Sequence, residues 1–149
     1  MPWCNTIHFG RLEYNSASAI TFHDGLPGFE AECQFVVVQR PDHHPLVFLQ
    51  SLHTPDLCFP ALPVRAIDSG YELRVSEADR EALGFENAPA IGDTALALAL
   101  IALHEDDPAA NLLAPIVINL RTQSAAQCID PDMRYSHRYR LIATLELAS

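Results

Sequence analysis

The residues with the widest chemical repertoire in this chain are four cysteines and seven histidines. The cysteines lie far apart and form no C-x-x-C pair, whereas a cysteine-based metal site usually needs close pairs to complete a tetrahedron. His43 and His44 stand in the turn-forming stretch "PDHHP", where neighbouring side chains diverge and cannot easily chelate together. We therefore expect a solvated loop at the histidine pair, and reduced, buried thiols. The cysteines are Cys4, Cys33, Cys58 and Cys128.

Two further groups could perform acid–base or nucleophilic catalysis. His23, Asp24 and Glu30 surround a glycine-rich turn, and Ser51 stands two residues before His53. A catalytic triad is defined by positions in space, and the chain contains no G-x-S-x-G, H-E-x-x-H or G-x-G-x-x-G pattern. A pair of acids as in a glycosidase stays open, because their separation is a structural quantity. With no set of residues in the roles of nucleophile, base and stabiliser, we expect no enzyme, no metal ligands and no cofactor.

The stretch "DGLPGFE" at residues 24–30 has the composition of a tight turn. Pro27 presets the φ angle of one central position, and Gly28 can take the positive φ that a type II turn requires at the next. We expect Phe29 to tuck beneath the turn as its hydrophobic anchor. The stretch is therefore predicted to be structural rather than catalytic.

The charge of the chain is strongly negative and unevenly distributed. Nineteen acidic residues face nine arginines, lysine is absent from the sequence, and the net charge is −10. The lack of lysine excludes a Walker A loop and Schiff-base chemistry, and the net charge argues against direct binding of nucleic acid. Between Asp68 and Asp107, ten acids face only Arg74 and Arg80. Such a field can steer a basic protein toward the chain, and it can equally serve solubility.

Short apolar segments separated by turn residues indicate an all-β fold. A chain of 149 residues suits one domain, and no linker or internal repeat divides it. We predict a small barrel-like single domain, residues 1–149, of short antiparallel strands with one short surface helix. Extended segments are expected at residues 6–14, 19–22, 33–39, 46–52, 57–63, 71–75 and 114–122.

Three segments have distinctive residue patterns. Pro60 and Pro63 would confine residues 57–63 to an edge or irregular strand. Residues 71–75, "YELRV", alternate apolar and polar side chains as a half-buried strand does. Leucine alternates strictly with alanine in residues 94–105, which favours a strand over a helix and leaves one face of small residues for another element to cover.

Helix signals occur at two places. Ser76 can cap a helix over "EADREALG", whose acids suit the first turn and whose Gly84 supplies the stop. Its thin apolar stripe predicts a short helix at the surface. Asp107 followed by Pro108 could begin one further helical turn.

Neither a membrane span nor a secretion signal is expected. The longest uncharged apolar run, residues 95–103, is far shorter than the roughly 20 residues that cross a bilayer. The N-terminal residues carry neither the charged nor the apolar region of a signal peptide. We therefore expect a cytoplasmic protein that does not contact a membrane.

Three stretches, taken together, resemble the flagellar assembly factor FliW family. They are "ITFHDGLPGFE", "FLQSLHTPDLCF" and "NLLAPIVIN", and the similarity covers about residues 7–141. The resemblance implies a small barrel-like all-β domain with a short helix. It also implies protein binding: FliW-like proteins bind CsrA, a basic RNA-binding dimer that represses flagellin translation, at a surface away from its RNA site. They also bind flagellin, so that secretion of flagellin frees them to titrate CsrA.

Two other functions compete with this one. The first is a chaperone-like protein that binds flagellin and not CsrA. The second is a small-molecule enzyme, which would need a deep pocket lined by convergent polar groups.

The resemblance also implies site residues. The family's Tyr-Glu pair matches Tyr71 and Glu72, which we expect at the CsrA contact, and local charge suggests Asp106 and Asp107 as well. The remaining motif positions are expected to shape the fold. They are Gly25, Pro27, Gly28, Phe29, Asn111, Pro115 and Asn119.

Two stretches depart from the family pattern. Pro63-Val64 stands where the family commonly has Asp-Pro. Residues 121–130, "RTQSAAQCID", replace a segment that is usually rich in lysine, arginine and glycine. If that basic segment contacts a partner, this chain binds the partner differently.

Overall fold

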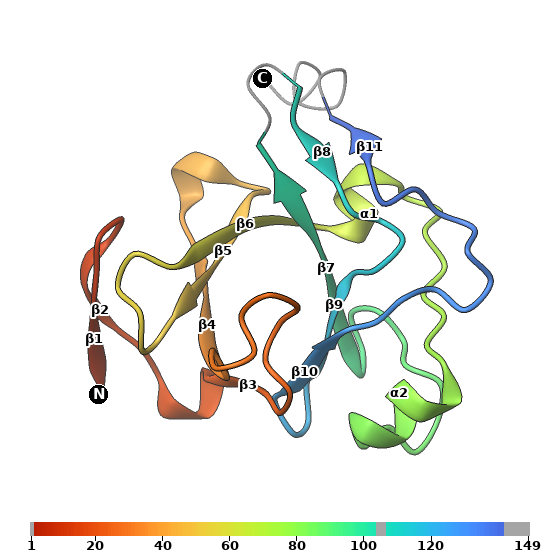
Figure 1. The fold of residues 1–149 in the computed structure, drawn as a ribbon, viewed down its shortest axis with the longest axis horizontal. Coiled ribbons are helices and arrows are strands. Elements are labelled where there is room, and N and C mark those ends of the chain that lie inside the picture. The colour runs from red at the N-terminus through yellow and green to blue at the C-terminus, as the bar shows by residue number, and fades with distance from the viewer. Residues whose placement is uncertain (1, 104–106, 142–149) are drawn as a thin grey trace.

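The computed structural model describes residues 2–103 and 107–141, and strands dominate its architecture (Figure 1). The elements are β1 (Trp3–Thr6), β2 (Gly10–Glu13), η1 (Ser16–Ser18), β3 (Ile20–Phe22), β4 (Gln34–Gln39), η2 (Pro41–His43), β5 (Val47–Ser51), β6 (Cys58–Pro63), α1 (Val64–Ile67), α2 (Glu77–Ala82), β7 (Ala95–Ala102), β8 (Ala109–Ala110), β9 (Ile116–Asn119), β10 (Ser124–Gln127) and β11 (Tyr139–Arg140).

Seven of these strands close into a barrel. The main sheet has the order β11-β8-β7-β6-β5-β4-β3-β10-β9, and a further pairing of β7 with β9 closes it. Neighbours run antiparallel except β3 and β10, which are parallel. An odd number of strands cannot alternate in direction all the way round, so one parallel pair is unavoidable. The predicted all-β, barrel-like fold is confirmed.

The hairpin and the short strands lie outside this ring. The hairpin β1–β2 lies on one side of the barrel, and β8 and β11 extend the sheet beyond β7 (Figure 1). The helix α2 lies on the side opposite the hairpin.

The inside of the barrel is filled by aromatic and aliphatic side chains. Phe22 and Phe35 are completely buried and meet edge to face, with 5.4 Å between their ring centroids. Leu98 of β7 packs in the same cluster. On the other face of β7, Ala97 and Ala99 lie beneath a second apolar layer that includes Tyr71, Leu112 and Leu141. The predicted strand with one face of small residues is therefore confirmed, and the small residues make room for that layer.

The strand β6 corrects the prediction that its prolines place it at an edge. It pairs with β5 on one side and β7 on the other. Pro60 lies opposite Phe48 of β5 but outside the β6–β7 ladder, which covers only residues 61–63. Pro63 lies at the last ladder position and also precedes α1 as its N-cap. Neither proline therefore removes a donor from the middle of the β6–β7 ladder.

The segment predicted as a strand at residues 71–75 is not one. Its alternation is real, since Tyr71 is buried and Glu72 is exposed, but no strand within residues 2–103 and 107–141 pairs with it. The helix predicted after it is confirmed: Ser76 accepts a hydrogen bond from the amide of Asp79, and Gly84 ends the helix with φ +77°. The four-residue helix α1 was not predicted.

The helical turn predicted at Asp107 is also wrong. Asp107 and Pro108 are in no helix, and β8 begins directly after them. The amide of Leu141 donates to the carbonyl of Pro108, which aligns this stretch with β11 instead. Asp106 lies outside the described residues.

Candidate functional site

The unpaired segment between α1 and α2 displays the residue that the sequence singles out as a partner contact. The Glu72 side chain is 68% exposed, whereas the neighbouring Tyr71 is only 2% exposed. The Tyr71 hydroxyl donates a 2.7 Å hydrogen bond to the carbonyl of Leu112. Burial raises the pKa of Tyr71 well above its ordinary value, so the phenol stays a donor at any physiological pH. Tyr71 therefore anchors the segment from inside and has almost no surface of its own to offer a partner.

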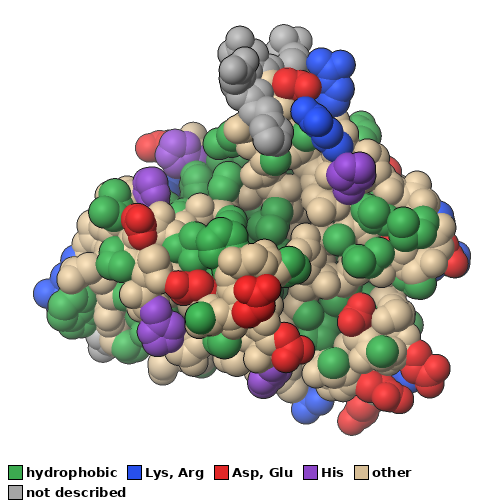
Figure 2. Space-filling model, in the orientation of Figure 1, with side chains coloured by type: hydrophobic (Ala, Val, Ile, Leu, Met, Phe, Trp, Pro, Cys, Tyr) green, Lys and Arg blue, Asp and Glu red, His purple; other side chains and the backbone are tan. Residues whose placement is uncertain are grey.

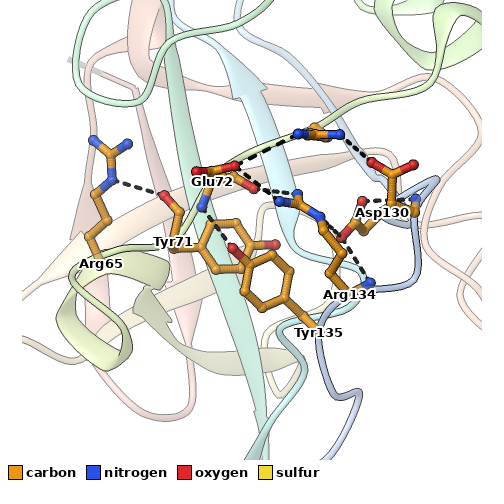
Figure 3. Close-up of polar contacts among 8 residues, drawn as sticks. Arg65, Tyr71, Glu72, Asp130, Arg134 and Tyr135 are labelled. Carbon is orange, nitrogen blue, oxygen red and sulfur yellow. Dashed lines mark hydrogen bonds and ion pairs between the residues drawn. The ribbon is translucent and has the colours of Figure 1, made fainter.

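Two residues from the C-terminal part of the chain hold Glu72 at three points (Figure 3). The Glu72 amide donates to the hydroxyl of Tyr135 at 2.9 Å. The Arg134 guanidinium donates to the Glu72 carbonyl at 2.9 Å and to its carboxylate at 3.2 Å. The carbonyl of Tyr71 in turn accepts from Nε of Arg65 at 3.3 Å. Side chains thus satisfy the backbone groups that a neighbouring strand would otherwise pair.

Glu72 also belongs to a row of side chains with alternating charge: Asp132, Arg74, Glu72, Arg134 and Asp130. Its successive N···O distances are 2.5, 3.9, 3.2 and 3.1 Å. Exposure is greatest at Glu72 and falls from there through Arg134, at 28%, to the carboxylate of Asp130, at only 2%. A count of charged residues in the sequence overstates the negative field at Glu72, because two guanidinium groups lie within 4 Å of its carboxylate.

The remaining acidic candidate belongs to another group. Asp107 pairs with Arg140 at 3.0 Å, beside β8 and β11. The ion pairs of the described residues do not connect it with Glu72. Figure 2 shows acidic side chains gathered over the end of the molecule where α2 lies, and Glu77 and Asp79 stand in the first turn of that helix.

The motif "DGLPGFE" forms the predicted turn. The amide of Phe29 donates to the carbonyl of Leu26 at 2.7 Å, and Gly28 has φ +84°. Gly25 also has a positive φ, and a Cβ atom there would lie 2.5 Å from the backbone oxygen of Glu30. The expected anchor was wrong: Phe29 is 41% exposed, whereas Leu26 is 3% exposed and packs in the barrel core. Phe29 instead meets the edge of Phe59 at the surface.

The motif "NLLAPIVIN" supports both ends of its own strand. The Asn111 side chain accepts from the amide of Ala114 at 3.0 Å and fixes the turn that precedes β9, which begins directly after Pro115. The buried Asn119 side chain donates to the carbonyl of Leu83 at 2.8 Å. The contacts of both asparagines lie within the protein.

His23 and Ser51, both considered for catalysis, have different hydrogen-bond partners. The ring of His23 lies 3.3 Å from the hydroxyl of Ser124. The Ser51 hydroxyl donates to the carboxylate of Glu32 at 2.7 Å, and Thr54 donates to the same carboxylate. These hydrogen bonds from Thr54 and Ser51 lower the pKa of Glu32 and tie the loop after β5 to the body of the molecule.

The histidine, cysteine and carboxylate side chains of the described residues form neither a metal site nor a disulfide. Within residues 2–103 and 107–141, no group of three histidine, cysteine or carboxylate side chains could hold a metal. All four cysteines are free, and burial raises the pKa of the Cys128 thiol to about 12. Of the four, only Cys128 is fully buried, so the expectation of buried cysteines holds for that one alone.

Sequence reasoning missed Asp130, Arg134 and Tyr135. They follow the last strand of the barrel; Arg134 and Tyr135 contact Glu72 across 62 and 63 residues, and Asp130 contacts Arg134. The stretch "DPDMRY" offers one local signal, the i,i+4 spacing of Asp130 and Arg134, but nothing that names Glu72 as their partner.

Comparisons with known proteins agree with this architecture. The family model described as "FliW protein" matches residues 4–141. The flagellar assembly factor FliW of Thermosipho africanus is 31% identical over 132 residues, covering 89% of this chain and 90% of that relative. The relative of the same name from Geobacillus kaustophilus is 34% identical, covering 91% and 92%, and that from Bacillus subtilis is 28% identical, covering 91% and 93%.

A solved structure is similar over the same range. The crystal structure of a flagellar assembly factor FliW superimposes with a TM-score of 0.82 at 30% identity, covering 95% of this chain and 97% of that one. In the described part of the chain, no helix has the length and apolar character needed to cross a membrane. The family match, the relatives and the shared barrel together establish that this chain belongs to the FliW family of flagellar assembly factors.

Proposed function

We propose that this chain regulates flagellar assembly in the cytoplasm by binding two proteins, the translational repressor CsrA and flagellin. Binding of CsrA is non-competitive with RNA, and flagellin competes for the regulator, so that export of flagellin frees it to bind CsrA and relieve repression of flagellin translation. The observation that carries the proposal is membership of the FliW family over residues 4–141. The function needs no catalytic residue and no cofactor.

The position of Glu72 supports a role in binding CsrA. Its carboxylate projects into solvent with 68% of the side chain exposed, on a segment fixed by neighbouring side chains. A fixed, exposed carboxylate suits a cationic partner, and the net charge of −10 favours encounter with one. We assign Tyr71 the indirect role of anchoring this segment. Asp107 and Asp106 remain candidate contacts at a second place.

Calorimetric titration with purified CsrA and flagellin from the same organism tests the proposal. Each partner alone should form a saturable complex, and the association rate with CsrA, measured by stopped flow, should fall as salt is added. The Glu72→Arg variant should bind CsrA more weakly, whereas Glu13→Arg on the hairpin, an exposed acid on the opposite side of the barrel, should bind as the native chain does (Figure 1). If CsrA produces neither heat nor co-elution at low salt, the CsrA part of the proposal is wrong.

The chaperone-like alternative predicts a different pattern. Flagellin would bind both the native chain and Glu72→Arg equally, while CsrA would bind neither. Titration in the presence of the second partner also tests linkage, because two ligands that exclude each other must do so reciprocally.

A further inference from the structure

The segment that displays Glu72 lacks the support that a strand would have. Residues 71–76 join no sheet, so their backbone groups depend on other partners. We infer that Arg134 and Tyr135 are positioning residues that hold the Glu72 carboxylate ready for its protein partner. The inference rests on the proposed function and adds to it the residues that prepare the contact.

Tyr135 has a fixed place from which to hold Glu72. Its ring stacks on that of Tyr71 with 4.2 Å between centroids and 21° between planes, and the Arg134 guanidinium lies 5.0 Å from the centroid of the Tyr135 ring. The stacked ring sets the hydroxyl 2.9 Å from the Glu72 amide. Tyr71 is hydrogen-bonded to Leu112 and packs with it in one apolar cluster. The stack on Tyr71 therefore fixes the position of Tyr135 relative to the barrel.

Arg134 is fixed in the same way by a buried carboxylate. Its Nε donates to the Asp130 carboxylate at 3.1 Å. The backbone of Asp130 is held in turn, because its amide donates to the carbonyl of Leu113 at 2.8 Å. The two terminal nitrogens of Arg134 then remain for Glu72, one for the carbonyl and one for the carboxylate. One guanidinium therefore sets the backbone and the side chain of Glu72 relative to each other.

This arrangement matters because Glu72 is exposed. A free glutamate side chain at the surface loses rotamer freedom when a partner binds it, and that loss weakens the complex. With its backbone and one carboxylate oxygen already held, Glu72 has less freedom left to lose. The carbonyl of Leu112 holds Tyr71, on which Tyr135 stacks, and the carbonyl of Leu113 holds Asp130, which binds Arg134. The "NLLAPIVIN" motif therefore has a part in the site.

The Tyr135→Phe variant tests the inference, because it removes only the hydroxyl and keeps the stacking ring. We expect binding of CsrA to weaken about three- to tenfold, the factor that one ordinary hydrogen bond contributes, and amide exchange of Glu72 to become faster in the free protein. Tyr139→Phe, a matched change at a 40% exposed tyrosine on β11, should change neither quantity. In the double variant with Glu72→Gln, the Tyr135 change should weaken binding no further, because it acts through Glu72.

Three outcomes would overturn the inference while leaving the proposed function intact. They are native binding by Tyr135→Phe, an unchanged exchange rate at the Glu72 amide, or an equal loss of binding in the Glu72→Gln background. If Glu72→Gln alone binds CsrA as the native chain does, the proposed contact itself is wrong and the inference fails with it.

Discussion

The hydroxyl of Tyr71 reaches the carbonyl of Leu112 across 2.7 Å, joining the segment before α2 to the turn before β9. Both residues are almost wholly buried, so neither group has water as a substitute partner. This one bond ties the displayed segment to the "NLLAPIVIN" motif.

Replacing Tyr71 by phenylalanine should destabilise the protein by about 1–3 kcal/mol, because the carbonyl of Leu112 would remain buried with its side-chain donor removed. The apolar packing of the ring is kept, so the loss comes from the hydroxyl. Urea unfolding followed by circular dichroism measures the difference. Tyr139→Phe is the control and should change the free energy of unfolding by less than about 0.5 kcal/mol; equal values for the two variants would contradict the prediction.

Gly25→Ala should cost more stability than Gly28→Ala. Both glycines have a positive φ, which costs an alanine about 1–2 kcal/mol. A Cβ at Gly25 would in addition meet the backbone of Glu30 at 2.5 Å, whereas nothing lies within 4 Å of a Cβ at Gly28. Thermal unfolding of the two variants side by side gives the order, and the reverse order would show that the turn yields more easily than its geometry suggests.

Asn119→Asp should destabilise the protein more than Asn119→Ala. The amide nitrogen of the buried Asn119 donates to the carbonyl of Leu83, and a carboxylate there would place an acceptor against an acceptor. Alanine loses the hydrogen bond, at a cost of about 1–3 kcal/mol, without adding that repulsion. Chemical unfolding at neutral pH checks the order. An aspartate variant as stable as the native chain would mean that the end of α2 moves away.

Glu32→Gln should lower stability at neutral pH by about 1 kcal/mol, and the difference should shrink in acid. Hydrogen bonds from Thr54 and Ser51 lower the pKa of Glu32 in the folded state. The carboxylate therefore adds stability above the ordinary glutamate pKa of about 4.3, and this contribution is lost as the pH falls through the lowered value. Unfolding free energies of both proteins across this range test the sign, and a difference that grows on acidification would reverse it.

Local chemistry in the sequence was enough to predict several elements. The turn at Gly28, the capped helix after Ser76 and the alternating strand β7 each depend on residues within one short stretch. The barrel class follows from many short apolar segments. These features are specified by φ preference, capping and two-residue alternation, which all act over a few residues.

The errors arose where distant residues decide the outcome. Residues 71–75 alternate as a strand does, but whether a partner strand exists is set elsewhere in the fold. Pro60 is tolerated in a central strand because the β7 ladder happens to begin one residue later. The same limit applies to the site: Glu72 could be named from the sequence, whereas the clamp formed by Arg134 and Tyr135 depends on contacts across 62 and 63 residues.

The parallel pair that joins β3 to β10 also has a consequence for synthesis. The barrel cannot close until Ser124 has been translated and pairs with Thr21. Tyr135, which contacts Glu72, is translated later still. When β3 to β7 have left the ribosome, they form a sheet with two open edges, and residues 71–76 still lack their supporting contacts. Closure requires contacts of large sequence separation, which form slowly. The barrel and the contacts around Glu72 are therefore complete only after Tyr135 has left the ribosome.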